Sequence, residues 1–60
     1  MKEGDLVKVN NSTEVENCWE IDHIINFPND NGIEIYECFN INDDKKELFS
    51  FYEEELTKIN

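Results

Sequence analysis

The most informative absence in this 60-residue sequence is arginine. The chain has five lysines and no arginine, against fifteen aspartates and glutamates, so its formal net charge is −10 at pH 7. Binding to a phosphate backbone depends on cationic side chains that displace counterions, so direct nucleic-acid binding is disfavoured. Docking on an anionic membrane surface is disfavoured for the same reason. The acidity favours a basic protein partner, or it serves solubility alone.

Cysteine and histidine are also scarce. Cys18 and Cys38, with the single His23, do not have the spacing of a zinc site, so we expect no metal and no cofactor. No hydrophobic run approaches the length of a membrane span, and there is no signal peptide or lipidation motif. We therefore expect a cytoplasmic protein with free thiols. No nucleophile and base stand out together in the sequence, so we also expect a non-enzyme.

Sixty residues form one domain, residues 1–60, near the lower limit at which a chain can bury enough apolar surface to fold alone. Hydrophobic residues make up 38% of the chain and aromatic residues 12%, which indicates a folded domain and not a disordered acidic tail.

Residues 14–27 show the clearest pattern. Large apolar residues occupy odd positions and acids occupy even positions, which is typical of a half-buried strand. At roughly 3.3 Å per residue this strand would be about 45 Å long, so it should bend. The alternation places His23 on the apolar side. The acids of this stretch are Glu14, Glu16, Glu20 and Asp22.

Four further strands are expected, at residues 6–10, 33–39 and 47–51 and at the C-terminal edge near Ile59. Asn31-Gly32 suits a hairpin reversal, and the three glutamates before Leu56 suit one short 3-10 turn. Residues 33–39 are apolar on both faces or interrupted by a bulge, and the pattern does not choose between these. The residues expected in the core are Val7, Val9, Trp19, Ile21, Ile25, Phe27, Phe51, Leu56 and Ile59.

The opening Gly4-Asp5-Leu6-Val7-Lys8-Val9 and the closing Phe51-Tyr52-Glu53-Glu54-Glu55-Leu56 resemble the small SH3-like barrels. These include KOW-type modules and short barrels encoded by phages and other mobile elements of low-GC bacteria. The resemblance implies an all-β fold, a single small five-stranded SH3-like barrel. The chain departs from the KOW pattern because it lacks the basic residues and the Gly-rich turn of the second strand, which argues against RNA contact.

Acids spaced about 6 to 7 Å apart along a strand come close to the spacing of phosphates in nucleic acid. The sharpest hypothesis is a phage or mobile-element inhibitor that mimics phosphates and blocks a host nucleic-acid-binding or defence protein. The alternatives are a solvated acidic face, a KOW-like nucleic-acid-binding barrel, and an accessory module with an aromatic ligand surface at Tyr36 and Tyr52, both expected to be partly exposed. The predicted partner-binding residues are Glu14, Glu16, Glu20, Asp22, Glu34, Tyr36, Glu37, Tyr52, Glu53 and Glu54.

Overall fold

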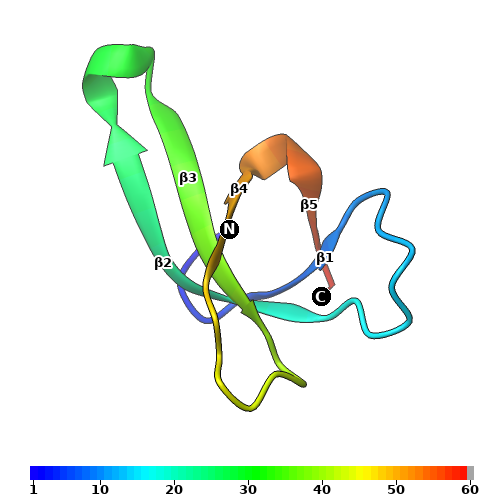
Figure 1. Ribbon diagram of the computed structural model, residues 1–60. Helices are drawn as coiled ribbons and strands as arrows, with labels where there is room; N and C mark the ends of the chain where they lie inside the picture. The colour runs from blue at the N-terminus through cyan, green and yellow to red at the C-terminus, as the bar shows by residue number, and fades with distance from the viewer. Residues whose placement is uncertain (60) are drawn as a thin grey trace.

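The computed structural model describes residues 1–59 as one five-stranded antiparallel sheet (Figure 1). The strand order is β4-β3-β2-β1-β5, and within the described residues β4 and β5 are edges that do not pair with each other. The all-β prediction is confirmed, and so is the short 3-10 turn directly before the last strand. No described helix is long and apolar enough to cross a membrane. The elements are β1 (Leu6–Val9), β2 (Trp19–Phe27), the 3-10 turn η1 (Pro28–Asp30), β3 (Ile33–Asn40), β4 (Phe49–Tyr52), the 3-10 turn η2 (Glu53–Glu55) and β5 (Leu56–Lys58).

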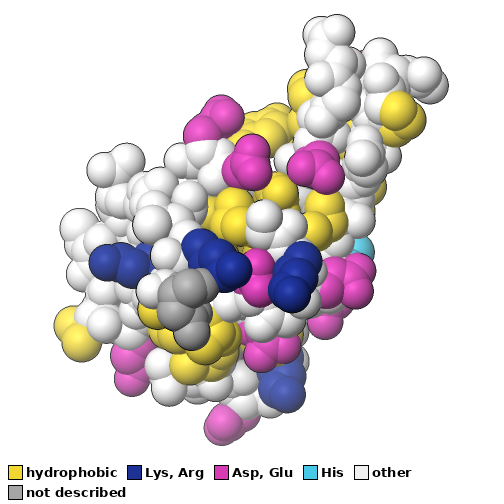
Figure 2. Space-filling model, turned by 180° about the vertical axis from the view of Figure 1, so that it is seen from behind, with side chains coloured by type: hydrophobic (Ala, Val, Ile, Leu, Met, Phe, Trp, Pro, Cys, Tyr) yellow, Lys and Arg dark blue, Asp and Glu magenta, His cyan; other side chains and the backbone are white. Residues whose placement is uncertain are grey.

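The β2–β3 hairpin is the longest feature of the molecule. Its far half, residues 25–34, pairs with no other described strand and extends from the rest of the sheet as an arm with η1 at its tip (Figure 1). The chain reverses at Asn31 and Gly32, whose φ angles of 62° and 73° lie in the left-handed region that asparagine and glycine tolerate best. The arm exposes apolar side chains, among them Phe27 and Ile33, and Figure 2 shows such side chains along it.

The second strand is shorter than predicted because residues 10–18 form a loop. Near the end of this loop, the Asn17 side chain pairs with the backbone of Val9, where a neighbouring strand would otherwise pair. Its Oδ1 accepts the Val9 N–H at 2.8 Å, and its Nδ2 donates to the Val9 carbonyl at 2.9 Å. The same Oδ1 accepts the Trp19 indole N–H at 3.1 Å. Side-chain bonds of this kind compete with a regular ladder, so β2 begins only at Trp19.

A β-bulge interrupts β2 and changes which side chains face inward. Ile21 pairs with Cys38, but His23 pairs with Glu37, which leaves Asp22 as the extra residue. Past this point the alternation is inverted. Ile24 therefore faces the core, while Ile25 and Phe27 lie on the outer face with His23. The predictions that Ile25 and Phe27 are core residues and that His23 lies on the apolar face are wrong for this reason.

The core lies on the inner face of the curved sheet. Trp19 packs edge-on against Phe49 and Phe51, with ring centroids 5.8 and 5.5 Å apart. Val9, Ile24 and Phe51 pack against this cluster as partly buried neighbours. The buried cluster consists of Val7, Trp19, Ile21, Tyr36, Cys38 and Leu56.

The predicted core is confirmed at Val7, Trp19, Ile21 and Leu56. It is wrong at Ile59, which is 43% exposed because β5 ends at Lys58 and Ile59 follows it. Tyr36 and Cys38 join the core because β3 is apolar on both faces. Tyr36 pairs with Ile24 on one side and with Phe51 on the other, so its ring is buried and not partly exposed as expected.

Candidate functional site

An acidic cleft of about 450 Å³ lies where the start of β3 meets the end of β4 and η2. It contains four of the predicted partner-binding residues, contributed by three separate elements. The cross-strand pair Ile35–Tyr52 joins these elements, so residues 17 positions apart in the sequence become neighbours. Among residues 1–59, no lysine lines the cleft. The lining residues are Asn31, Gly32, Ile33, Glu34, Tyr52, Glu53 and Glu54.

The turn from β4 into η2 determines the positions of the cleft residues Glu53 and Glu54. Glu55 folds back, and its Oε1 accepts the backbone N–H of Tyr52 at 2.9 Å. This bond ends β4 and directs the chain into the 3-10 turn, as a residue of the first turn does when it caps a helix start. Glu53 and Glu54 remain exposed beside Tyr52, whose side chain is 50% exposed.

Tyr36 supports the cleft from beneath. Its ring is buried in the core, and its hydroxyl donates to Glu34 Oε1 at 3.3 Å. Burial raises the pKa of Tyr36 to about 12, and the negative charges of Glu34 and Glu53 add to this. The phenol therefore stays protonated in neutral solution and remains a hydrogen-bond donor. Tyr36 orients a cleft carboxylate but does not offer a surface of its own.

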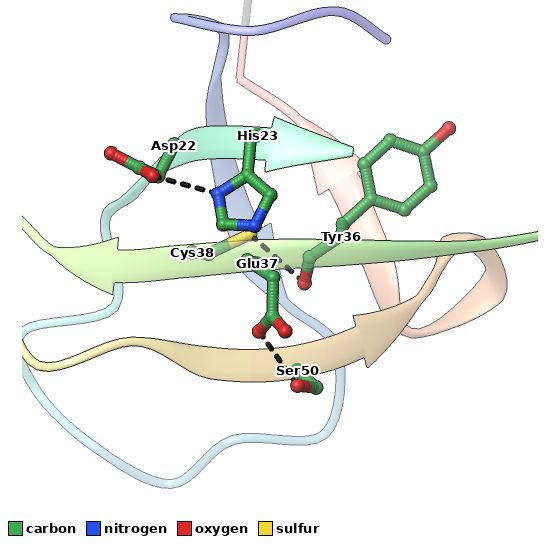
Figure 3. Close-up of polar contacts among 6 residues, drawn as sticks. All are labelled: Asp22, His23, Tyr36, Glu37, Cys38 and Ser50. Atoms are coloured by element: carbon green, nitrogen blue, oxygen red, sulfur yellow. Dashed lines mark hydrogen bonds and ion pairs between the residues drawn. The ribbon is translucent and has the colours of Figure 1, made fainter. Parts of the chain in front are cut away.

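A second polar group lies on the outer face of β2, β3 and β4 (Figure 3). His23 Nδ1 and Asp22 Oδ2 are 2.8 Å apart, and Ser50 Oγ donates to Glu37 Oε2 at 2.6 Å. His23 and Glu37 are cross-strand partners. Because the serine hydroxyl donates to a carboxylate and not to the histidine, the group lacks the nucleophile–base contact of a hydrolase. It forms an anionic patch to which Glu20, on the same face, also belongs.

Glu14 and Glu16 are placed apart from both groups. They are exposed in the loop before β2, where the Glu14 N–H donates to Ser12 Oγ and the Glu16 carbonyl accepts the amide of Asn40. The predicted row of four acids along one strand is therefore wrong. Only Glu20 and Asp22 belong to β2, and Asp22 is the extra residue of the bulge.

Sequence reasoning missed Asn31, Gly32 and Ile33 as cleft residues and Ser50 as a partner of Glu37. The register of the hairpin and of β3–β4 was the only signal that could have placed them. Within residues 1–59 no group of three or more His, Cys, Asp or Glu side chains is arranged to hold a metal ion. Comparison of the chain with protein-family models, curated proteins and solved structures gave no match. What the site does is therefore inferred from its geometry and charge.

Proposed function

We propose that this protein is a non-enzymatic binding module whose acidic cleft accepts a cationic side chain of a basic protein partner. The observation that carries the proposal is the convergence of Glu34, Glu53 and Glu54 around one half-exposed tyrosine, with no lysine among the lining residues. Carboxylates pair with a lysine or arginine, and the tyrosine face attracts the same cation. The overall charge of −10 steers a basic partner toward the molecule.

The sharpest form of this proposal is a phage or mobile-element inhibitor that occupies the basic surface of a host nucleic-acid-binding or defence protein. The outer-face acids Glu20, Asp22 and Glu37 support it, because they add a second anionic surface on neighbouring strands. The cytoplasm is the compartment we propose, since Cys18 and Cys38 are free thiols.

We also propose that the curved sheet has the architecture of an SH3-like barrel. The single core cluster supports this, since it draws residues from β1, β2, β3 and β5 to one interior. An accessory module with an aromatic ligand surface is the second candidate, and it is favoured by the exposure of Tyr52.

The cleft is tested by titrating a short lysine-rich peptide into the protein and following backbone amide shifts by NMR. The largest shifts are expected at Glu34, Tyr52, Glu53 and Glu54. The double variant Glu53→Gln with Glu54→Gln should weaken binding strongly. The matched control is Glu3→Gln with Asp44→Asn, which removes the same charge from exposed positions outside the cleft lining. Equal weakening by both double variants would show attraction to net charge alone and would overturn the cleft.

A gel shift at low salt separates the inhibitor from the KOW-like alternative. The protein should not shift DNA or RNA by itself, because it lacks the cations that contact phosphates. It should abolish the shift that a basic nucleic-acid-binding target produces. A direct shift by the protein alone would instead support a nucleic-acid-binding barrel.

A further inference from the structure

The two open edges of the sheet are built differently. β5 carries the polar Thr57 and Lys58, and the Lys58 ammonium lies 3.7 Å from Asp5. A charged lysine on an edge strand is a common protection against pairing with another chain. β4 has the sequence Phe-Ser-Phe-Tyr, with no charge and no proline, and its register with β3 is continuous. β4 therefore lacks the protection that β5 has.

The backbone of Ser50 points away from the sheet. The Tyr52 N–H donates to Glu55 and not to β3, so Ile35–Tyr52 is a pair without ladder hydrogen bonds. Hydrogen-bonded and non-hydrogen-bonded pairs alternate along an antiparallel ladder, so Glu37–Ser50 is also a pair of this second kind. The N–H and C=O of Ser50 thus face the open side of β4. Ser50 is exposed there, and Phe49 and Tyr52 at the two ends of β4 are 47% and 50% exposed.

The two faces beside this edge differ in character. On the inner face the edge presents Phe49 and Phe51, which continue the apolar core. On the outer face it presents the small Ser50, whose hydroxyl is bonded to Glu37 of the next strand. A strand added at β4 would lie roughly 10 Å from β3, which is two strand spacings. A long cationic side chain that passes over Ser50 spans that distance and reaches the Glu37 carboxylate.

We propose that β4 is a docking edge that accepts an extended segment of the basic partner as a sixth strand. Apolar residues of the segment pack beside Phe49 and Phe51, and the alternating lysines or arginines lie on the outer face, where the one that passes over Ser50 reaches Glu37. The segment is therefore one in which apolar and cationic residues alternate, as strand addition requires. The inference rests on the proposed function for the charge of the partner, but it uses the edge of the sheet and not the cleft.

The test uses the peptide acetyl-Lys-Val-Lys-Val-Lys-Val-Lys-amide and two isomers of it. Each isomer is N-methylated at alternate residues, so each lacks the hydrogen-bond donors of one strand edge. Only one edge of an added strand faces β4, so one isomer should bind like the parent while the other loses roughly tenfold in affinity. Trp19 fluorescence is a suitable readout, since its ring contacts both edge phenylalanines. Equal affinity of the two isomers would overturn the docking edge.

A matched pair of protein variants tests the same point. Ser50→Pro removes the outward N–H. Proline is tolerated at such an edge position, so the variant should fold but should no longer bind the parent peptide. Ser50→Ala removes only the hydroxyl and should bind within a few-fold of the wild type. If Ser50→Pro does not fold, the N-methylated isomers still decide the question. Self-association of the wild type in sedimentation that Ser50→Pro abolishes would overturn the proposal, because a second copy would then occupy the edge.

The outcomes for edge and cleft are separable. Unequal isomer binding that survives Glu53→Gln with Glu54→Gln supports the edge while removing the cleft from the binding. Equal isomer binding that this double variant abolishes retains the cleft and overturns the edge.

Discussion

Two buried groups, the Tyr36 phenol and the Cys38 thiol, give the molecule a specific weakness toward alkali. Burial raises the pKa of Tyr36 from 10.0 to about 12 and the pKa of Cys38 from 9.0 to about 11. A group with a raised folded-state pKa stabilises the native state fully below its unfolded value, and this contribution is lost as the pH rises toward the folded value. The thiol contribution is therefore lost between about pH 9 and 11, and the phenol contribution between about pH 10 and 12.

Tyr36→Phe should flatten the upper part of this decline. The variant keeps the buried ring and loses the hydroxyl bonded to Glu34, so below pH 10 it should be only slightly less stable than the wild type. Between pH 10 and 12 the stability of the wild type should fall more steeply than that of the variant. Urea unfolding followed by circular dichroism at a series of pH values measures both curves. Tyr52→Phe is the control, because that side chain is exposed. Parallel curves for Tyr36→Phe and wild type would contradict the assignment.

The stability of the fold also depends on the packing of Trp19. It lies against both phenylalanines of β4, and its N–H is held by Asn17 in the preceding loop. Trp19→Ala should destabilise the fold by roughly 3 to 5 kcal/mol, a large share of the 5 to 15 kcal/mol typical of a domain. Val15→Ala, at a fully exposed loop position, should leave the urea midpoint unchanged. An unchanged urea midpoint for Trp19→Ala would show that the indole does not contribute to the core.

Among the elements, β2 contains a bulge that can be removed by a single deletion. Asp22 is the extra residue between Ile21 and His23, so its deletion leaves every β2–β3 pair and both faces in place. The deletion variant should remain folded, with a cooperative thermal transition at a somewhat lower temperature. Deletion of Glu20 should instead unfold the protein, because a one-residue slip moves Trp19 to the outer face. Near-ultraviolet circular dichroism distinguishes the two. Loss of the native signal in the Asp22 deletion would show that the bulge itself holds the fold.

The same bulge explains how far the sequence could predict the fold and the site. Alternation located the strands at residues 6–10 and 14–27, because one buried face per strand leaves a period of two in the chain. The other three strands were placed from apolar residues between turns. Alternation could not reveal the inversion after Asp22, since Asp22 and His23 are both polar and either register reads alike. The acids of the cleft were predictable one by one. Their convergence depends on the pairing of Ile35 with Tyr52, a contact between distant segments that no local pattern encodes.

At the scale of the whole molecule, fifteen carboxylates surround a body with a radius of gyration of 11.4 Å. Figure 2 shows acids and lysines interspersed over one face, but the acids outnumber the lysines threefold. Self-repulsion of this net charge destabilises the compact state, and salt screens it. The melting temperature should therefore rise between about 0.15 M and about 1 M sodium chloride, where the screening length falls from about 8 to about 3 Å. A falling melting temperature would mean that local ion pairs outweigh the net repulsion.

Lowering the pH should destabilise the protein through two carboxyl groups, Asp5 and Asp43. Backbone N–H groups that donate to Asp5 and Asp43 lower the pKa of both carboxyls below 3.8. Their stabilising contribution is present above that value and is lost as the pH falls through the lowered values.

The pairing of β1 with β5 also determines how the molecule responds to mechanical force. The two strands run antiparallel, with Val7 opposite Lys58 and Val9 opposite Leu56, so the start of one lies beside the end of the other. A load applied through residues that flank these two ends pulls across the ladder, and its hydrogen bonds open one after another instead of sharing the load. The sheet should thus peel apart at low force along this axis.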